Sequence, residues 1–296
     1  SVNIKQLLEA GVHLGHKTHR WNPKMERYIF GAKNSIHIID LVQTLELTKA
    51  ALSEIHKCIA GGGKILFVST KKQATDTISD LAKDTSQFYV NHRWLGGMLT
   101  NWKTISNSIK RYKKLTEDLK KENTGLTKKE ILKMGIQRDK LQRSLGGIAD
   151  MKKTPNMIFI IDTNVENLAV KEAQKLNIPI IAIIDTNSDP TGINFPIPGN
   201  DDARRAINLY CELVKQTIID AQKNIQKIEN IDQRPQENKE VKQTEKVQKS
   251  DSTEAPKAAK TKTNKKSIEK LKKDGITKKS TSLFAKIKKI ASKKSK

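Results

Sequence analysis

The chain has 296 residues, with 56 Lys and Arg against 32 Asp and Glu, so its formal net charge is +24. Self-repulsion at this charge is costly unless a polyanion neutralises it, which makes nucleic acid the first candidate partner and an anionic membrane surface the second. No run of eighteen apolar residues occurs, and we expect a cytoplasmic chain without membrane-spanning or secretory segments. Cys58 and Cys211 lie far apart within helical patterns, which predicts two buried thiols.

The first distinctive stretch is HLGHKTHRWNPKM, residues 13–25. His13, His16 and His19 are spaced by three, and three imidazoles are able to bind zinc, but no cysteine is near and nothing makes the rings converge. The favoured interpretation is a cationic surface with an aromatic ring on which a base or sugar rests. The predicted RNA-binding residues of this stretch are His16, Lys17, His19, Arg20, Trp21 and Lys24.

Short apolar runs alternate with helical patterns in the following part of the chain. The runs at 64–70, 157–163 and 178–186 are apolar on both faces, which is typical of parallel strands covered by helices, whereas 36–40 and 87–91 are weaker strand candidates. Helices are predicted over 42–60, 73–83, 165–176 and 202–228. This alternation predicts an α/β fold with a doubly wound, mainly parallel sheet flanked by helices. Its ligand sites would lie after Val68, Val90, Ile161 and Ile184, at the carboxyl ends of the strands.

Two stretches resemble phosphate-binding loops. GGGK at 61–64 closes a helix and enters a strand, the reverse of a Walker loop, so Gly61 or Gly62 is predicted to cap the helix. Thr70, Lys71 and Lys72 follow a strand and precede a helix, where free backbone N–H groups favour an anion. A nucleotide phosphate and an RNA phosphate fit equally well; without a metal-binding pair nearby we favour RNA, with an ordinary helix start as the alternative.

The stretch NHRWLGGMLTNWKT, residues 91–104, holds two of the three tryptophans. Arg93 and Trp94 follow a predicted strand, the glycines at 96 and 97 permit close approach of the backbone, and Lys103 lies where the next helix begins. These three residues are predicted to contact RNA, and the alternative is that the tryptophans only pack against the sheet. No nucleophile and general base are paired here, which disfavours catalysis.

More than sixty residues separate the predicted strands at 87–91 and 157–163. Apolar residues recur every three or four positions in two segments, and Thr127 with Glu130 forms a capping box at the start of the second. A coiled-coil hairpin over 103–148 is therefore predicted as an insertion into a sheet domain made of 1–102 and 149–232. Lys110, Arg111 and Lys113 on its outer face are predicted RNA contacts, and the alternative is a solvated helix face.

Two further segments invite a functional interpretation. Asp185, Asp189, Asp201 and Asp202 are able to hold a divalent metal, but a turn at Asp189 and a helix cap at Asn200 or Asp201 explain them without one. The tail, 233–296, carries 21 Lys and Arg against 7 Asp and Glu. Its composition predicts disorder, with an amphipathic helix near 283–291 that would form on an acidic partner.

Seven blocks, among them GVHLGHKTHRWNPKM, KILFVSTKKQA, SLGGIADM and IPIIAIIDTNSDPTGINFPIPGNDDARRAI, resemble in order the signature blocks of bacterial small-subunit ribosomal protein two. The resemblance spans most of residues 4–213 and leaves out the tail. It implies a structural constituent of the 30S subunit, located on cytoplasmic ribosomes, without enzymatic activity, cofactor, membrane or small-molecule substrate.

The resemblance further implies contacts with 16S-type ribosomal RNA between head and body and with neighbouring small-subunit proteins. It also implies docking of the mRNA-binding ribosomal protein one, and so a role in translation initiation. Arg93 and Lys103 are then expected to meet phosphates. The competing interpretations are a nucleotide-using enzyme with its site at 70–72, and a membrane-surface protein acting through the tail.

Overall fold

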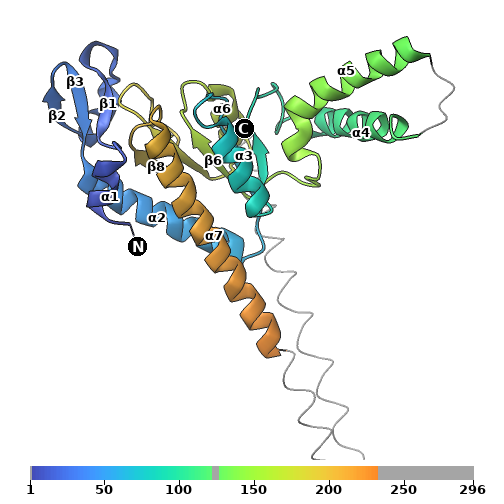
Figure 1. Cartoon of the computed structure of the whole chain (residues 1–296). Coiled ribbons are helices and arrows are strands. Elements are labelled where there is room, and N and C mark those ends of the chain that lie inside the picture. Colours follow the sequence, from blue (N-terminus) through green and yellow to red (C-terminus); the bar gives the residue numbers. More distant parts are fainter. Residues whose placement is uncertain (1, 122–126, 233–296) are drawn as a thin grey trace, which may run out of the picture. The chain divides into compact units, whose positions relative to one another are not determined.

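A computed structural model describes residues 2–121 and 127–232 (Figure 1). The predicted tail at 233–296, with its amphipathic helix, lies outside the described residues. The elements in chain order are α1 (Ile4–Glu9), β1 (Leu14–Lys17), the 3-10 helices η1 (Thr18–Arg20) and η2 (Pro23–Tyr28), β2 (Ile29–Lys33), β3 (Ile36–Ile39), α2 (Leu41–Ala60), β4 (Ile65–Val68), α3 (Thr75–Asp84), β5 (Phe88–Val90), α4 (Trp102–Asp118), α5 (Lys128–Leu145), η3 (Gly146–Ile148), β6 (Met157–Ile161), α6 (Asn167–Lys175), β7 (Ile180–Ile184), β8 (Phe195–Pro198) and α7 (Arg204–Asp232).

The main sheet has five parallel strands in the order β5-β4-β6-β7-β8. Every residue of β4, β6 and β7 is buried, which confirms the three strands predicted from apolar runs. The weaker candidate at 87–91 is β5, at one edge. The other edge is β8, which the sequence did not predict because Pro196 and Pro198 occupy two of its four positions. An edge strand tolerates proline because its backbone N–H groups pair with a neighbouring strand on one side only.

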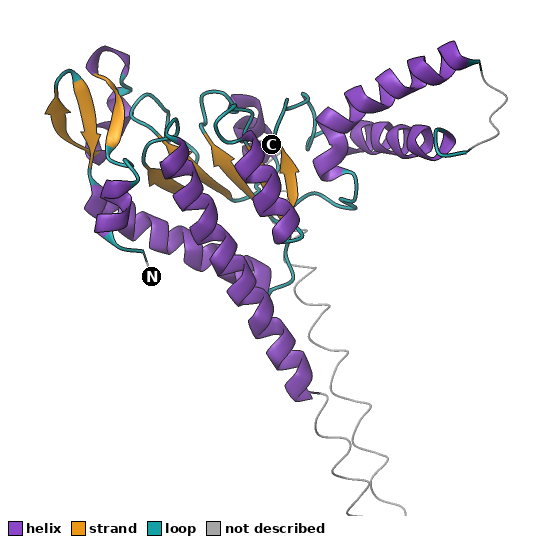
Figure 2. Ribbon diagram, viewed as in Figure 1, coloured by secondary structure: helices purple, strands orange, loops and turns teal. Residues whose placement is uncertain are grey.

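A second sheet of three antiparallel strands, in the order β1-β3-β2, precedes the parallel sheet along the chain (Figure 2). The weaker strand candidate at 36–40 is β3, the central strand of this sheet. The strands β1 and β2 were not predicted. Both are short, each contains a glycine, and each pairs with a shift in register, so neither shows a regular alternation of apolar residues.

Two apolar layers cover the two faces of the parallel sheet. Phe67 and Phe159, in paired strands, meet edge to face with ring centroids 5.6 Å apart and pack with α1, α2, α3 and α7. Their neighbours Leu66 and Ile158 face the opposite layer, which α6 and the base of the α4–α5 hairpin complete. This arrangement confirms the doubly wound fold. Cys211 is buried as expected, whereas Cys58 is only partly buried.

The hairpin of α4 and α5 is buried only where it joins the sheet domain. Ile105 and Ile109 of α4 pack there with Leu145 of α5, whereas Ile131, one of the recurring apolar residues of the second predicted segment, is 42% exposed. Thr127 and Glu130 form the predicted capping box at the start of α5. Figure 1 shows the two helices projecting side by side from the sheet domain. The greater part of the hairpin surface is therefore available to a partner.

Candidate nucleic-acid interface

The loop that leads into the hairpin is folded around one carboxylate, that of Glu172 on α6. Trp94 Nε1 and the backbone N–H of Gly97 donate to Glu172 Oε1 over 3.1 and 2.7 Å. The backbone N–H groups of Leu99 and Thr100 and the Thr100 hydroxyl donate to Oε2 over 2.9, 3.1 and 3.1 Å. Glu172 therefore accepts five hydrogen bonds from a segment far away in sequence, and this fixes the root of the hairpin.

The environment of Glu172 favours its charged form. Burial alone would raise its pKa, but the hydrogen bonds donated by Thr100, Leu99, Trp94 and Gly97 outweigh burial and hold the pKa below the ordinary value. Trp94 is only 6% exposed, so the face of its ring is not accessible to RNA. This burial favours the alternative that Trp94 packs against the sheet domain. Gly97 adopts a φ of +81°, a conformation that favours glycine.

Exposed cations surround this root. We call the group Arg93, Lys103, Lys110, Arg111 and Lys113 the hairpin surface; all five side chains are exposed. Arg111 Nη2 lies 3.4 Å from Gln137 Oε1, and Lys113 Nζ lies 2.9 Å from an exposed oxygen of Asp150. Exposed pairs of this kind contribute little to stability and exchange readily for other anions. The hairpin surface is therefore suited to phosphate contacts.

Lys71 has a different role from the predicted one. Its ammonium is 2.8 Å from Asp162 Oδ2, 2.8 Å from Asp201 Oδ1 and 2.6 Å from Asp202 Oδ1, and its side chain is 13% exposed. Three internal carboxylates therefore neutralise the lysine that was expected to bind a phosphate. They meet there because the loops that follow parallel strands converge at one edge of the sheet.

The backbone at this loop is also occupied. The N–H of Thr70 donates to Glu166 Oε1 over 2.8 Å, and α3 begins only at Thr75, so the predicted free donors of a helix start are not found at Thr70. Burial lowers the pKa of Lys71, but the charge of Asp201 and the hydrogen bonds with the three carboxylates outweigh burial and raise it above the ordinary value. Burial and the charges of Asp162 and Asp185 raise the pKa of Asp201. Of Thr70, Lys71 and Lys72, only Lys72 is exposed.

Acidic loops also hold two residues of the predicted N-terminal site. His16 Nδ1 lies 2.9 Å from Asp185 Oδ2, and His16 Nε2 lies 3.5 Å from Asp202 Oδ2. Hydrogen bonding with Asp185 raises the pKa of His16, and burial only partly offsets this rise. Lys24 Nζ lies 2.7 Å from Asp189 Oδ2.

Asn200, one of the two predicted caps, accepts hydrogen bonds from the backbone N–H groups of Asp202 and Ala203, which precede α7. Within 2–121 and 127–232 no group of three or more His, Cys, Asp or Glu side chains is arranged to hold a metal ion.

The remaining N-terminal candidates stay exposed. We call Lys17, His19, Arg20 and Trp21 the N-terminal surface; the Trp21 side chain is 37% exposed, with its ring centroid 5.4 Å from that of His37. This segment is joined to the loop after β7, because the backbone N–H of Asn22 donates to the carbonyl of Thr186. The hairpin instead follows β5, at the opposite edge of the sheet (Figure 1). The predicted residues therefore form two cationic surfaces rather than one.

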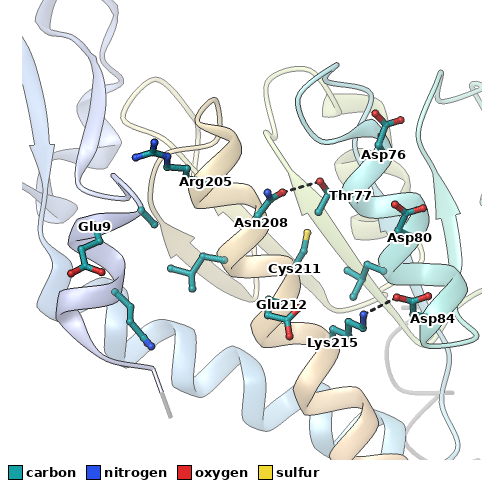
Figure 3. A pocket seen from close by; sticks show the side chains of 14 residues that line it. Glu9, Asp76, Thr77, Asp80, Asp84, Arg205, Asn208, Cys211, Glu212 and Lys215 are labelled. Carbon is teal, nitrogen blue, oxygen red and sulfur yellow. Dashed lines mark hydrogen bonds and ion pairs between the residues drawn. The ribbon is translucent and has the colours of Figure 1, made fainter.

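A groove of about 790 Å³ between α1, α3 and α7 has the opposite charge (Figure 3). Five carboxylates line it, and one of them, Asp84, is paired with Lys215 at 2.7 Å. The carboxylates are those of Glu9, Asp76, Asp80, Asp84 and Glu212. A polyanion is repelled from this groove, which leaves the hairpin surface and the N-terminal surface as the candidate RNA interface.

The model of the ribosomal protein S2 family matches residues 7–221. The chain belongs to the ribosomal protein S2 family. The small ribosomal subunit protein uS2 of Parvibaculum lavamentivorans is 57% identical over 77% of this chain and 90% of its own length. Those of Chelativorans and Mesorhizobium japonicum are 60% and 59% identical over 74% of this chain and over 82% and 84% of their own lengths.

Sequence reasoning missed two residues that shape the candidate interface of this S2 family member. In the sequence, Glu172 looks like any acidic residue on the exposed face of a helix. Asp162 directly follows a buried strand, and no motif around it indicates a role. Only the folded chain brings Glu172 to the loop at 94–100 and Asp162 to Lys71. No helix among the described residues is long and apolar enough to cross a membrane.

Proposed function

We propose that the chain is a structural component of the small ribosomal subunit in the cytoplasm that binds 16S-type ribosomal RNA between head and body and catalyses no reaction. The observation that carries the proposal is membership of the ribosomal protein S2 family over residues 7–221. Relatives at 57–60% identity bear the name of a small ribosomal subunit protein. The exposed cations at the hairpin root supply the electrostatic term that RNA binding requires.

The hairpin surface and the N-terminal surface together support this proposal. Both consist of exposed side chains, and the acidic groove between α1, α3 and α7 lies on other elements. We expect Arg93 and Lys103 to contact phosphates at the hairpin root, and Lys110, Arg111 and Lys113 to continue the contact along α4. Lys72 adds one exposed cation at the carboxyl end of the sheet, whereas Lys71 stabilises that end internally.

A nucleotide-using enzyme on the same sheet is disfavoured by the loop at 70–72. A nucleotide phosphate would meet Asp162, Asp201 and Asp202 around Lys71, and the N–H of Thr70 already has an acceptor. The carboxylates repel an anion unless a cation intervenes.

The test is the salt dependence of binding to small-subunit ribosomal RNA, measured by filter binding. The full chain is compared with a Lys103→Gln/Lys110→Gln/Arg111→Gln variant and with a control, Lys49→Gln/Lys57→Gln/Lys175→Gln, that removes the same charge elsewhere. Affinity falls as salt rises, so the slope of log affinity against log salt is negative. We expect this slope to be shallower in the first variant, by about 0.7 to 0.9 for each phosphate that the variant no longer neutralises. Equal slopes for the two variants would contradict the proposed interface.

We propose in addition that the bound protein docks the mRNA-binding ribosomal protein one and contacts neighbouring small-subunit proteins, and so supports translation initiation. Support for this comes from the family resemblance alone. Subunits assembled with and without this chain, incubated with the labelled partner and separated by sedimentation, test it. Equal occupancy by the partner in both preparations would contradict the docking role while leaving RNA binding intact.

A further inference from the structure

A polar pocket of about 490 Å³ opens at the root of the hairpin. Its walls come from α3, the end of β5, α4, and the junction of α5 with η3. The residues that bear on its chemistry are Tyr89, Asn91, His92, Tyr112, Gln142 and Arg143. None of them is fully buried, and His92, Gln142 and Arg143 are exposed. The pocket is therefore open to a ligand from solvent.

Gly147 keeps one wall of this pocket close to the sheet. A Cβ atom at this position would lie 2.1 Å from the carbonyl oxygen of Tyr89 and 2.8 Å from its ring atoms. The backbone at 147 therefore packs directly against Tyr89, which positions that residue at the rim. Any larger residue would force η3 and β5 apart and deform the pocket.

The pocket combines aromatic rings, amides and charged groups. Besides Arg143, the charged residues that line it are Lys83 and Asp139, and Arg138 is paired with Asp139. Tyr89, Tyr112 and His92 offer aromatic rings, and Asn91 and Gln142 offer amides that donate and accept hydrogen bonds. The Arg143 side chain makes no hydrogen bond or ion pair with any side chain that the structure describes, whereas Arg138, earlier on α5, donates to Asp139 over 2.9 Å. An unpaired guanidinium beside rings and amides is suited to a ligand with a flat, hydrogen-bonding ring and a negative charge.

We propose that this pocket receives one unstacked nucleotide of ribosomal RNA. Aromatic stacking, amide contacts with base edges and a cation for the phosphate are the means by which proteins hold single-stranded nucleotides. Arg111 and Lys113, which flank Tyr112 in α4, provide cations for the neighbouring phosphates. The inference rests on the proposed RNA-binding function and goes further: the hairpin root binds a base, in addition to the backbone contacts of the hairpin surface.

The test uses the full chain and a small-subunit ribosomal RNA transcript. Tyr112→Leu removes the aromatic ring, and Tyr112→Phe is its control because it keeps the ring. Arg143→Gln removes a positive charge that lines the pocket. Lys133→Gln is its control, because it removes a positive charge from the same helix outside the pocket. We expect Tyr112→Leu and Arg143→Gln each to weaken binding on the order of tenfold, because stacking on one base and a phosphate contact are each of that size. Tyr112→Phe and Lys133→Gln should bind within about twofold of wild type.

Ultraviolet cross-linking with mass spectrometry locates the nucleotide. The expected result is a peptide containing Tyr112 or His92 linked to RNA in the wild-type complex and no such peptide in Tyr112→Leu. If all four variants bind RNA equally and no such cross-link forms, the pocket holds no base, although the proposed function stands. If the wild-type chain does not bind the RNA at all, the proposed function fails together with this inference.

Discussion

The side chains of Glu172 and Trp94 meet at 3.1 Å although 78 residues separate them along the chain. Glu172 lies on α6, which covers one face of the sheet, and Trp94 lies in the loop that leads to the hairpin. One carboxylate therefore connects the rigid sheet domain to the root of a projecting element. A hairpin that presents cations to RNA requires this orientation to be fixed, because a loosely held root would cost ordering entropy on binding.

Replacing Glu172 with Gln should loosen the hairpin root. The amide of Gln accepts through one oxygen and cannot satisfy all five donors, so we expect the free energy of unfolding to fall by about 1–3 kcal/mol. Urea unfolding followed by tryptophan fluorescence measures the change. Glu212→Gln is the matched control, because Glu212 is exposed on α7 and, among the described residues, its side chain accepts a hydrogen bond from Gln216 alone. Similar losses in both variants would contradict the role of Glu172.

Two glycines of the hairpin should respond in opposite directions to alanine. At Gly147 a Cβ would lie 2.1 Å from a backbone oxygen, so Gly147→Ala should destabilise the fold by about 1–3 kcal/mol. At Gly135, inside α5, no described atom other than those of its chain neighbours and the adjacent helix backbone lies within 4 Å of the added Cβ, so Gly135→Ala should stabilise by about 0.5–1 kcal/mol. Thermal unfolding of both variants tests the pair. A stabilising Gly147→Ala would show that the junction is not packed as described.

Removing the ammonium of Lys71 should expose its internal role. Lys71→Met leaves Asp162 and Asp201 buried without their counter-charge, and we expect a loss of about 3–5 kcal/mol in the free energy of unfolding. Lys72→Met, at the exposed neighbour, should change stability by less than about 0.5 kcal/mol. Adding Asp162→Asn to Lys71→Met should recover part of the loss. Equal stabilities of the two single variants would mean that Lys71 does not hold the loops together.

Acid should weaken the contact between η2 and the loop after β7. Hydrogen bonds from Lys24 and Thr191 lower the pKa of Asp189 from 3.8 to about 2. Because the folded pKa lies below the unfolded one, the stabilisation is complete above about pH 4 and is lost as the pH falls towards 2. The pair is half-exposed, so its contribution is less than about 1 kcal/mol.

The variant Lys24→Met should flatten the acid limb of stability against pH. Lys17→Met, which removes an exposed lysine of β1, should leave that limb unchanged. Unfolding midpoints in urea, measured in half-unit steps between pH 2 and 5, provide the comparison. A parallel shift of the two curves would exclude a specific Lys24–Asp189 contribution.

Local sequence patterns were sufficient for the elements that have a strong periodicity or a specific capping signal. The three central strands are runs of buried aliphatic residues, and the capping box at Thr127 and the helix end at Gly61 depend on residues a few positions apart. Such features are decided by backbone preference and by burial on both faces of a strand, which the chain carries locally. Strands β1 and β2 of the small antiparallel sheet carry no such signal, since they are short and largely exposed.

The sequence by itself determined the α/β class, the inserted hairpin and the concentration of positive charge, because composition and periodicity are properties of the chain alone. Only the tertiary structure decided which charges remain available. Lys71 and His16 were predicted to face RNA but are paired with carboxylates from distant loops, whereas Arg93 and Lys103 stay exposed. The reason is that the energy of a charge depends on its neighbours in space, and folding brings those neighbours together from segments that lie far apart along the chain.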